Sequence, residues 1–206
     1  VAAAKAYVAR DCPIDFYAGP TEIVIVSQNG KPEWVAADLI AQAEHDPEAR
    51  AILLTPNKTL AHKVKQMVQD QLKEHPSAKP SIKKNGVIVV TETIDDALQL
   101  ANAIAPEHAV TDTRAMANQL VRAGTIFVGA FSAQAAGDYA TGSNHVLPTN
   151  GVARYRGGLS ASDFVRVNSV QQLTRTGIRQ LASSVISLAN AEGLRGHAAS
   201  VARRLE

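Results

Sequence analysis

A glutamine and a histidine lie three residues apart near the end of a predicted helix, at Gln42 and His45. Residues at this spacing project from the same face of a helix. An amide oxygen and an imidazole nitrogen on one face have the geometry of metal ligands. A polar, solvated helix end is the alternative that these residues leave open. We expect Glu44, which lies between them, to be solvated.

A glutamate and a histidine are adjacent at Glu107 and His108, directly after Pro106. The proline ends the preceding helical pattern, so the pair stands at the start of a short predicted strand. A carboxyl group and an imidazole, with reference pKa values of about 4.3 and about 6.5, can divide the proton transfers of one reaction. The pair indicates acid–base catalysis, with ordinary surface polarity as the alternative.

Residues 136–148 combine Gly, Asp, Asn and His in a run that we interpret as too irregular for a strand or a helix. Asp138 and His145 have metal-ligating side chains, but Asp138 and Asn144 could instead bond their own backbone in Asx turns. His197, near the end of the chain, presents the same choice between ligand and surface histidine. We assign the remaining histidines of charged helical segments, His62 and His75, to solvent.

The elements that must position these residues follow from the hydrophobic pattern. Short β-branched runs alternate with longer amphipathic stretches, which is typical of a parallel α/β sheet. We expect strands over residues 22–26, 51–54, 87–90, 108–110 and 125–128, and helices over residues 33–44, 60–72, 95–104, 113–121, 170–190 and 193–205. The predicted fold class is α/β, with an incomplete Rossmann-like parallel sheet, flanking helices and a C-terminal helical tail.

Three parts are predicted along the chain. Residues 1–21 would end an upstream nucleotide-binding domain, residues 22–160 would form an α/β domain with the metal and acid–base residues, and residues 161–206 would form a helical dimerisation tail. Residues 18–22 suggest a tight turn that presents the Thr21 hydroxyl, and residues 129–160 a long site-bearing loop. Because Val1 opens directly into a helical pattern without a capping residue, we expect that the chain is cut from something longer.

Composition limits the function classes further. A chain of 206 residues fits one well-buried domain with an appendage, and its single cysteine, Cys12, cannot form an internal disulfide. With 21 Lys and Arg against 19 Asp and Glu, and 4% aromatic residues, the chain predicts no nucleic-acid partner. It contains no complete Gly-rich phosphate loop and no membrane-length apolar run. The opening apolar run is too short and too helical to be expected to act as a signal peptide. We expect a soluble, cytoplasmic protein.

Taken together, the polar motifs resemble those of the histidinol dehydrogenase family, the last enzyme of histidine biosynthesis. The resemblance covers essentially the whole chain but only the C-terminal half of the family's length. The motifs are residues 18–22, 42–45, 106–108, 136–140 and 141–148.

The resemblance implies an NAD-dependent, zinc-containing homodimer with shared active sites that oxidises L-histidinol through L-histidinaldehyde to L-histidine. It assigns the zinc ligands to Gln42, His45, Asp138 and His197, and the acid–base pair to Glu107 and His108. All six would also contact the substrate, as would Thr21, where the family usually has serine, and Glu192. His145, in a stretch that the family shares, would be a secondary substrate contact.

The family's NAD contacts would lie upstream of Val1, so we expect this chain alone to bind the cofactor poorly, which leaves open whether it is active alone. Two other functions remain compatible with the residues. One is a zinc-dependent hydrolase or deaminase, in which Glu107 shuttles protons to and from water. The other is a non-catalytic dimerisation module whose polar clusters are structural.

Overall fold

The computed structural model of the chain describes residues 2–206, which divide into two compact units. The first unit ends at Phe164 and the second spans Val165–Glu206. Val1 lies outside the described residues, and the predicted N-terminal helix is present as α1 (Ala2–Val8). The structure does not test the predicted three-part domain division, which stays a prediction.

A five-stranded parallel sheet forms the centre of the first unit. The strand order is β3-β2-β1-β4-β5, with β1 (Glu22–Val26), β2 (Arg50–Thr55), β3 (Gly86–Val90), β4 (His108–Thr111) and β5 (Thr125–Val128). Buried β-branched residues on both faces of the central strand favour this arrangement, because a parallel sheet is covered on both sides. The predicted parallel α/β class is confirmed.

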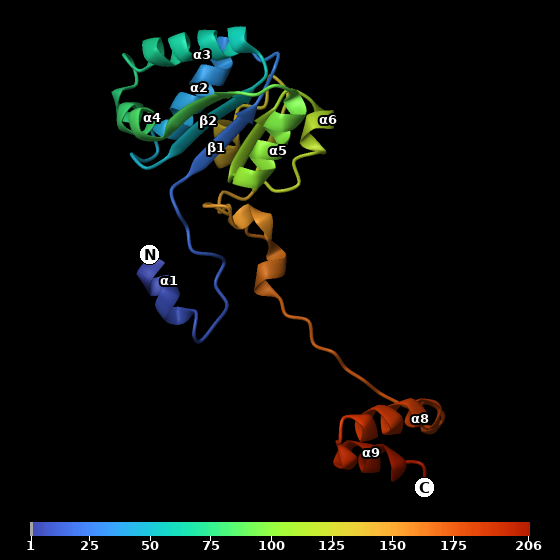
Figure 1. Cartoon of the computed structure of the whole chain (residues 1–206). Helices are drawn as coiled ribbons and strands as arrows, with labels where there is room; N and C mark the ends of the chain where they lie inside the picture. Colours follow the sequence, from blue (N-terminus) through green and yellow to red (C-terminus); the bar gives the residue numbers. More distant parts are fainter. Residues whose placement is uncertain (1) are drawn as a thin grey trace. The chain divides into compact units, whose positions relative to one another are not determined.

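Helices cover the two faces of this sheet, as Figure 1 shows. Alternate residues of β1 point to opposite faces, so Ile23 and Ile25 pack with α2 (Pro32–Ala43) and α3 (Lys58–Gln71). Val24 and Val26 pack with α5 (Ile94–Ile104) and α6 (Arg114–Ala117) on the other face. Two short helices that the sequence did not predict, η1 (Pro76–Ala78) and α4 (Lys79–Asn85), lead into β3.

Two helices end at the edge of the sheet where β1 and β4 begin. The helix α2 ends at Ala43, close to the predicted extent. The helix α5 ends at Ile104, its C-cap Ala105 adopts a left-handed backbone with φ of 56°, and Pro106 then prevents further helix. The sequence from Glu107 therefore turns directly into β4, as the motif predicted.

The predicted helix over residues 113–121 is wrong in length, because α6 ends at Ala117. The side chain of Asn102 on α5 forms hydrogen bonds with backbone groups that a longer α6 would have used within the helix. Its amide donates to the Gln119 carbonyl at 2.8 Å, and its oxygen accepts from the Val121 N–H at 2.9 Å. A side chain can replace helical hydrogen bonds in this way.

The predicted tight turn over residues 18–22 is also wrong, because no turn is present there and the segment runs directly into β1. The Gly19 N–H donates to the Thr149 hydroxyl at 2.6 Å, and a Cβ at Gly19 would lie 3.1 Å from the Asn150 Cβ. Long-range contact with residues 149–150 therefore replaces a local turn. Two 3₁₀ segments follow in this part of the chain, η2 (Val152–Arg154) and η3 (Ala161–Phe164).

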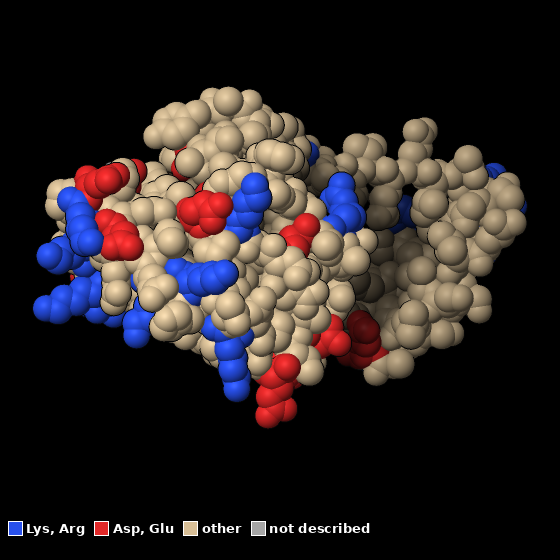
Figure 2. Space-filling model, turned by 90° about the horizontal axis from the view of Figure 1, so that it is seen from above, with Lys and Arg blue, Asp and Glu red and all other residues tan. Residues whose placement is uncertain are grey.

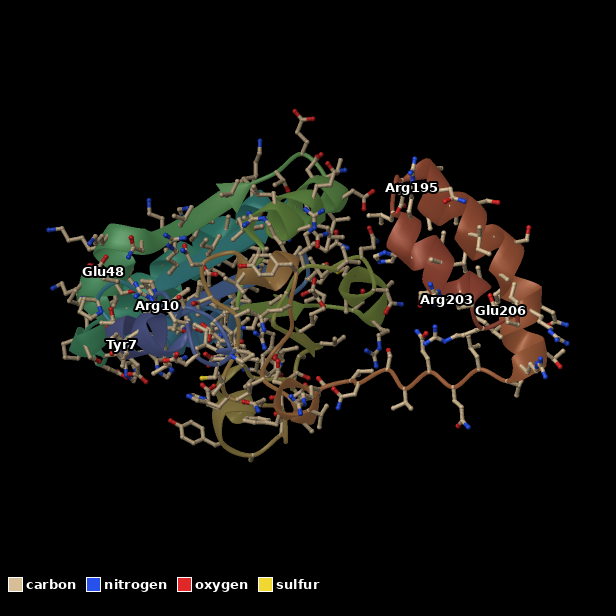
Figure 3. All side chains as sticks on the ribbon, turned by 90° about the horizontal axis from the view of Figure 1, so that it is seen from below. Tyr7, Arg10, Glu48, Arg195, Arg203 and Glu206 are labelled. Carbon is tan, nitrogen blue, oxygen red and sulfur yellow. The ribbon has the colours of Figure 1, made fainter. Side chains whose placement is uncertain are left out.

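The second unit is a hairpin of α8 (Arg175–Ala191) and α9 (Arg195–Ala202). The Thr174 side chain caps α8 by accepting from the Gly177 N–H, and Gly193 supplies the left-handed residue of the turn, with φ of 76°. Figure 3 shows Arg195 near the joined end of the two helices and Glu206 near the other end. There, Arg175 donates to the Glu206 backbone oxygen at 3.2 Å.

Lysine and arginine side chains are interspersed with aspartate and glutamate over the face that Figure 2 presents. The exposed side of α3 contributes to the charged surface, while its opposite stripe, Leu60, Val64 and Val68, enters the core. Among residues 2–206, no helix combines the length and the apolar character that crossing a bilayer requires.

Candidate active site

The predicted acid–base pair lies at the edge of the sheet where the parallel strands begin. His108 opens β4 and is paired in register with Ile23 of β1. Thr21 immediately precedes β1, so the strand pairing brings it beside Glu107 although the two residues are far apart in sequence. Glu107 and His108 are both buried. The sheet register therefore assembles this part of the site.

A chain of hydrogen bonds connects Gln42 to Glu107 through Thr21. The Thr21 hydroxyl donates to Glu107 Oε2 at 2.5 Å, and Gln42 Nε2 donates to the same hydroxyl oxygen at 2.7 Å. Because the only hydroxyl hydrogen is directed to the carboxylate, the Gln42 atom that faces Thr21 must be a donor. This network fixes the orientation of the Gln42 amide.

The same orientation leaves Gln42 Oε1 without a hydrogen-bond partner among the described residues, although Gln42 is fully buried. An unpaired buried oxygen is costly, and most such groups have a partner. A cation would supply one, since an amide oxygen is a ligand for borderline and hard metals. The chemistry of Gln42 therefore fits its predicted role as a metal ligand.

His108 is a buried, neutral imidazole with one nitrogen fixed. Its Nδ1 lies 3.3 Å from the Glu22 carbonyl oxygen, which can only accept, so Nδ1 carries the hydrogen of this bond. Nε2 then holds the free lone pair and faces Asp138 Oδ1 at 4.0 Å. Burial lowers the pKa of His108 to about 4, with the Asp138 carboxylate opposing the shift. At neutral pH the imidazole is thus available as a base.

Burial also raises the pKa of Glu107 above its ordinary value. The Thr21 hydroxyl and the Glu22 N–H, which lies 3.1 Å from Glu107 Oε2, act in the opposite direction by stabilising the charged form. A raised carboxyl pKa brings the group closer to neutral pH, where it can both accept and release a proton. The carboxyl and the imidazole are 3.7 Å apart at their nearest atoms.

Asp138 is presented by a short helix, α7 (Ala135–Tyr139), so the prediction that residues 136–148 contain no helix is wrong. The helix forms against Phe127 of β5: a Cβ at Gly137 would lie 2.6 Å from the Phe127 Cζ. Only glycine permits this close approach. Asp138 does not form an Asx turn, whereas Asn144 does, accepting from the Val146 N–H at 2.8 Å.

Three imidazoles surround the Asp138 carboxylate. His145 Nδ1 lies 3.3 Å from it, His45 Nε2 3.8 Å and His108 Nε2 4.0 Å. The His45 side chain is 42% exposed and stands next to α2, so it is accessible from solvent. The structure thus brings Thr21, Gln42, His45, Glu107, His108, Asp138 and His145 into one cluster.

The remaining predicted site residues, Glu192 and His197, belong to the second unit, where both are exposed. Their part in the site stays a prediction. Within residues 2–206, no group of three His, Cys, Asp or Glu side chains has the geometry to hold a metal ion. The first unit offers Gln42, whose oxygen is an amide, with His45 and Asp138, which is an incomplete ligand set for tetrahedral zinc.

Comparison with known proteins identifies the family of this chain. A family model of histidinol dehydrogenase matches residues 1–205. The chain belongs to the histidinol dehydrogenase family. A histidinol dehydrogenase from Methanothermobacter thermautotrophicus is 45% identical over 212 residues, which cover 100% of this chain and 50% of that protein. One from Bacillus cereus is 43% identical, with 100% and 50% covered.

Solved structures agree with this assignment. The crystal structure of histidinol dehydrogenase from Elizabethkingia anophelis is 35% identical to this chain and superposes with a TM-score of 0.91, covering 99% of this chain and 49% of that one. The chain therefore spans about half the length of the histidinol dehydrogenases that it matches.

Three further residues contact the predicted site residues without having been predicted to do so. Glu22 supplies the carbonyl to His108 and the N–H to Glu107, and a glutamate at the head of an apolar buried strand is a signal that could have identified it. Gln134 Nε2 donates to Asp138 Oδ2 at 3.3 Å, at the helical spacing of four residues. Phe127 places its ring 6.2 Å from the His108 ring, which no local pattern indicates.

Proposed function

We propose that this chain forms the substrate- and zinc-binding half of an NAD-dependent histidinol dehydrogenase that oxidises L-histidinol through L-histidinaldehyde to L-histidine. The observation that carries the proposal is the buried Glu107–His108 pair, linked through Thr21 to a glutamine with an unpaired oxygen. A neutral imidazole beside a carboxyl of raised pKa suits two successive proton-coupled oxidations.

Gln42, His45 and Asp138, completed by His197, would hold the zinc ion. The free oxygen of Gln42 and the proximity of His45 to Asp138 support this assignment. When bound, zinc would anchor the imidazole and amine of the substrate, since this ion has no redox chemistry of its own. Asp138 would keep its orientation through the amide of Gln134, which donates to its second oxygen.

His108 would accept the proton of the substrate alcohol in the first oxidation. Its Nδ1–H remains bonded to the Glu22 carbonyl, so the proton goes to Nε2. The hydride would leave the carbon that carries this hydroxyl, and NAD, when bound, would supply the hydride acceptor. The products of this step are the aldehyde, NADH and one proton held on His108.

Glu107 would then activate a water molecule that adds to the aldehyde. The carboxylate takes one proton from water as the water oxygen adds to the carbonyl carbon, and the proton held on His108 passes to the carbonyl oxygen. The resulting hydrate carries hydroxyl groups and can be oxidised like an alcohol. His108, having released its first proton to the carbonyl oxygen, would accept a hydroxyl proton of the hydrate as the second hydride leaves the same carbon. Thr21 keeps Glu107 in place and leaves its second oxygen free of the hydroxyl contact.

Thr21, Glu192 and His145 would complete the substrate contacts. The hydroxyl of Thr21 preserves the function of the serine that is usual at this position, while its methyl group narrows the site. His145 is 71% exposed and approaches Asp138, which supports a contact at the entrance. The cytoplasmic location predicted from the sequence stays a prediction.

Association into a homodimer with shared sites is also part of the proposal. The helix α8 exposes Leu181, Val185 and Leu188, with exposed fractions of 48%, 37% and 65%. Their spacing of four and three residues places them on one stripe of the helix. An uncovered apolar stripe on a small helical unit supports docking against another surface, from which Glu192 and His197 would reach a site of the partner.

The test measures NADH formation by a complete histidinol dehydrogenase chain that carries these 206 residues. Glu107→Gln should reduce oxidation of histidinaldehyde far more than oxidation of histidinol, because only the second step needs water. His108→Asn should reduce both by about 10²- to 10⁴-fold, the usual range for general acid–base catalysis. Single-turnover measurement separates these steps from product release.

Equal losses on both substrates for Glu107→Gln would assign that residue to substrate positioning. Turnover of either compound without NAD would favour the hydrolase instead, and absence of NADH from the unsubstituted protein would refute the proposal.

Sharing of the site is tested separately with mixed dimers. A chain with His197→Ala and a chain with Glu107→Ala should each be inactive alone. Mixing them should restore activity, because one site of the mixed dimer then receives an intact residue from each chain. Absence of restored activity in dimers verified to be mixed would mean that each chain builds its site alone.

A further inference from the structure

A cavity of about 350 Å³ lies at the opposite edge of the sheet from the candidate active site. Its walls include the residues that follow β1, β4 and β5, and the first turns of α2. The strand order reverses between β1 and β4, because β2 and β3 lie on one side of β1 and β4 and β5 on the other. Parallel sheets commonly bind ligands in the crevice at this point. The volume falls within the range of small-molecule sites.

One carboxyl group in this cavity has no partner. Asp38, in the middle of α2, lines the cavity, and no hydrogen bond or ion pair to its side chain is present among residues 2–206. Burial alone raises its pKa to about 6, with no neighbouring charge or donor acting against the shift. A cationic hydrogen-bond donor would stabilise a half-buried carboxylate of this kind, because it would replace the solvation that the carboxylate has lost.

The other charged groups of the cavity are already engaged. Asp112 accepts from the Ser27 hydroxyl at 2.6 Å and from the backbone N–H groups of Gln28 and Asn29 at 2.8 and 3.0 Å. These are the donors that a phosphate would need at the end of a strand, so Asp112 makes the cavity unsuitable for an anion. The Lys31 ammonium lies over the Trp34 ring, 4.1 Å from its centre, and forms no ion pair with Asp38 in the described chain.

We propose that this cavity binds a small organic ammonium compound, with its nitrogen on the Asp38 carboxylate and its apolar part against Ile25, Val35 and Val110. The three aliphatic residues line the cavity from β1, α2 and β4. Their apolar surface excludes a bare metal ion as the preferred ligand and favours a hydrocarbon group of a few carbons. The inference does not depend on the proposed function, because it uses the other edge of the sheet.

The chain contains a reporter for this site, because its only tryptophan, Trp34, lines the cavity. The probe is 3-methylbutylamine, and the matched neutral compound is 3-methylbutanol, which has the same hydrocarbon part. At neutral pH the amine should produce a saturable change in Trp34 fluorescence. The alcohol should bind at least about tenfold more weakly, as expected for loss of a charged hydrogen bond.

Two variants locate the binding. Asp38→Asn keeps the shape of the side chain and should weaken binding of the amine at least about tenfold. His45→Ala, at the other edge of the sheet, should bind the amine like the unsubstituted chain. Amide signals of Ser27 and Asp38 in ¹H–¹⁵N spectra of the unsubstituted chain should shift on addition of the amine, which tests the site without any substitution.

Absence of a saturable change with the amine would overturn the proposal. Equal binding of the alcohol, or undiminished binding by Asp38→Asn, would also overturn it. Loss of binding in His45→Ala, or amide shifts confined to residues 42–45, would place the amine in the candidate active site instead.

Discussion

Replacing Thr21 by valine removes the hydroxyl that connects Gln42 to Glu107 and keeps the shape of the side chain. The hydroxyl donates to a buried carboxylate at 2.5 Å, and hydrogen bonds to charged groups contribute about 1.5–3 kcal/mol. The Gln42 amide would lose its only acceptor in the network, and an unpaired buried donor costs about 1–3 kcal/mol. We expect the free energy of unfolding of the first unit to fall by about 3 kcal/mol.

Urea denaturation followed by Trp34 fluorescence measures this change. Trp34 is the only tryptophan and lies in the first unit, so unfolding of the α8–α9 hairpin does not contribute to the signal. Thr21→Ser is the matched control, because it keeps the hydroxyl and loses only a methyl group, worth about 1 kcal/mol. If the valine and serine variants unfold at the same urea concentration, the hydrogen-bond chain does not stabilise the unit and the reasoning fails.

Three further predictions concern other parts of the first unit. His45→Ala should lose bound zinc by metal analysis of the dialysed complete chain, whereas His62→Ala, on exposed α3, should keep it; equal contents would contradict the ligand assignment. Burial raises the folded-state pKa of Asp38 from 3.8 to about 6, so ionisation of this carboxyl lowers the stability of the folded chain as the pH rises through that value. Asp38→Asn should therefore unfold at a higher urea concentration than the unsubstituted chain at neutral pH. This difference should disappear as the pH falls toward 3.8. Gly137→Ala should lower thermal stability by about 1–3 kcal/mol through overpacking, and Gly157→Ala, whose Cβ would meet no atom within 4 Å, should not.

The sheet and most of its helices could be predicted from the sequence, because the spacing of the apolar residues and the positions of the turn-forming residues indicate the same elements. Within β1, residues 23–26 are all β-branched and the whole strand is buried, as expected of a central strand in a parallel sheet that is covered on both faces. The end of α5 follows from Pro106. The end of α6 does not, since it depends on Asn102, a residue of another helix.

The candidate site was predictable where its residues are neighbours in sequence. The adjacency of Glu107 and His108 keeps both residues at one edge of the sheet. The predicted helix face shared by Gln42 and His45 is wrong in detail, because α2 ends at Ala43 and His45 lies beyond it. The bond between Thr21 and Glu107 crosses 86 positions, and only the strand register determines it. Local propensity also misses α7, because its glycine disfavours a helix in isolation and is accommodated only by packing against β5.

The placement of the candidate site where strands begin has an electrostatic consequence. In a parallel α/β sheet the helix that follows a strand returns to this edge, so α2 and α5 both point their C-terminal ends at it, one just before His45 and the other just before Glu107. A helix carries a partial negative charge of about half an elementary charge at that end. Nucleotide phosphates are bound at the opposite ends of helices, where the partial charge is positive. This edge of the protein is thus biased toward cations before any side chain is counted, and a metal ion or a protonated imidazole is the kind of group that it attracts.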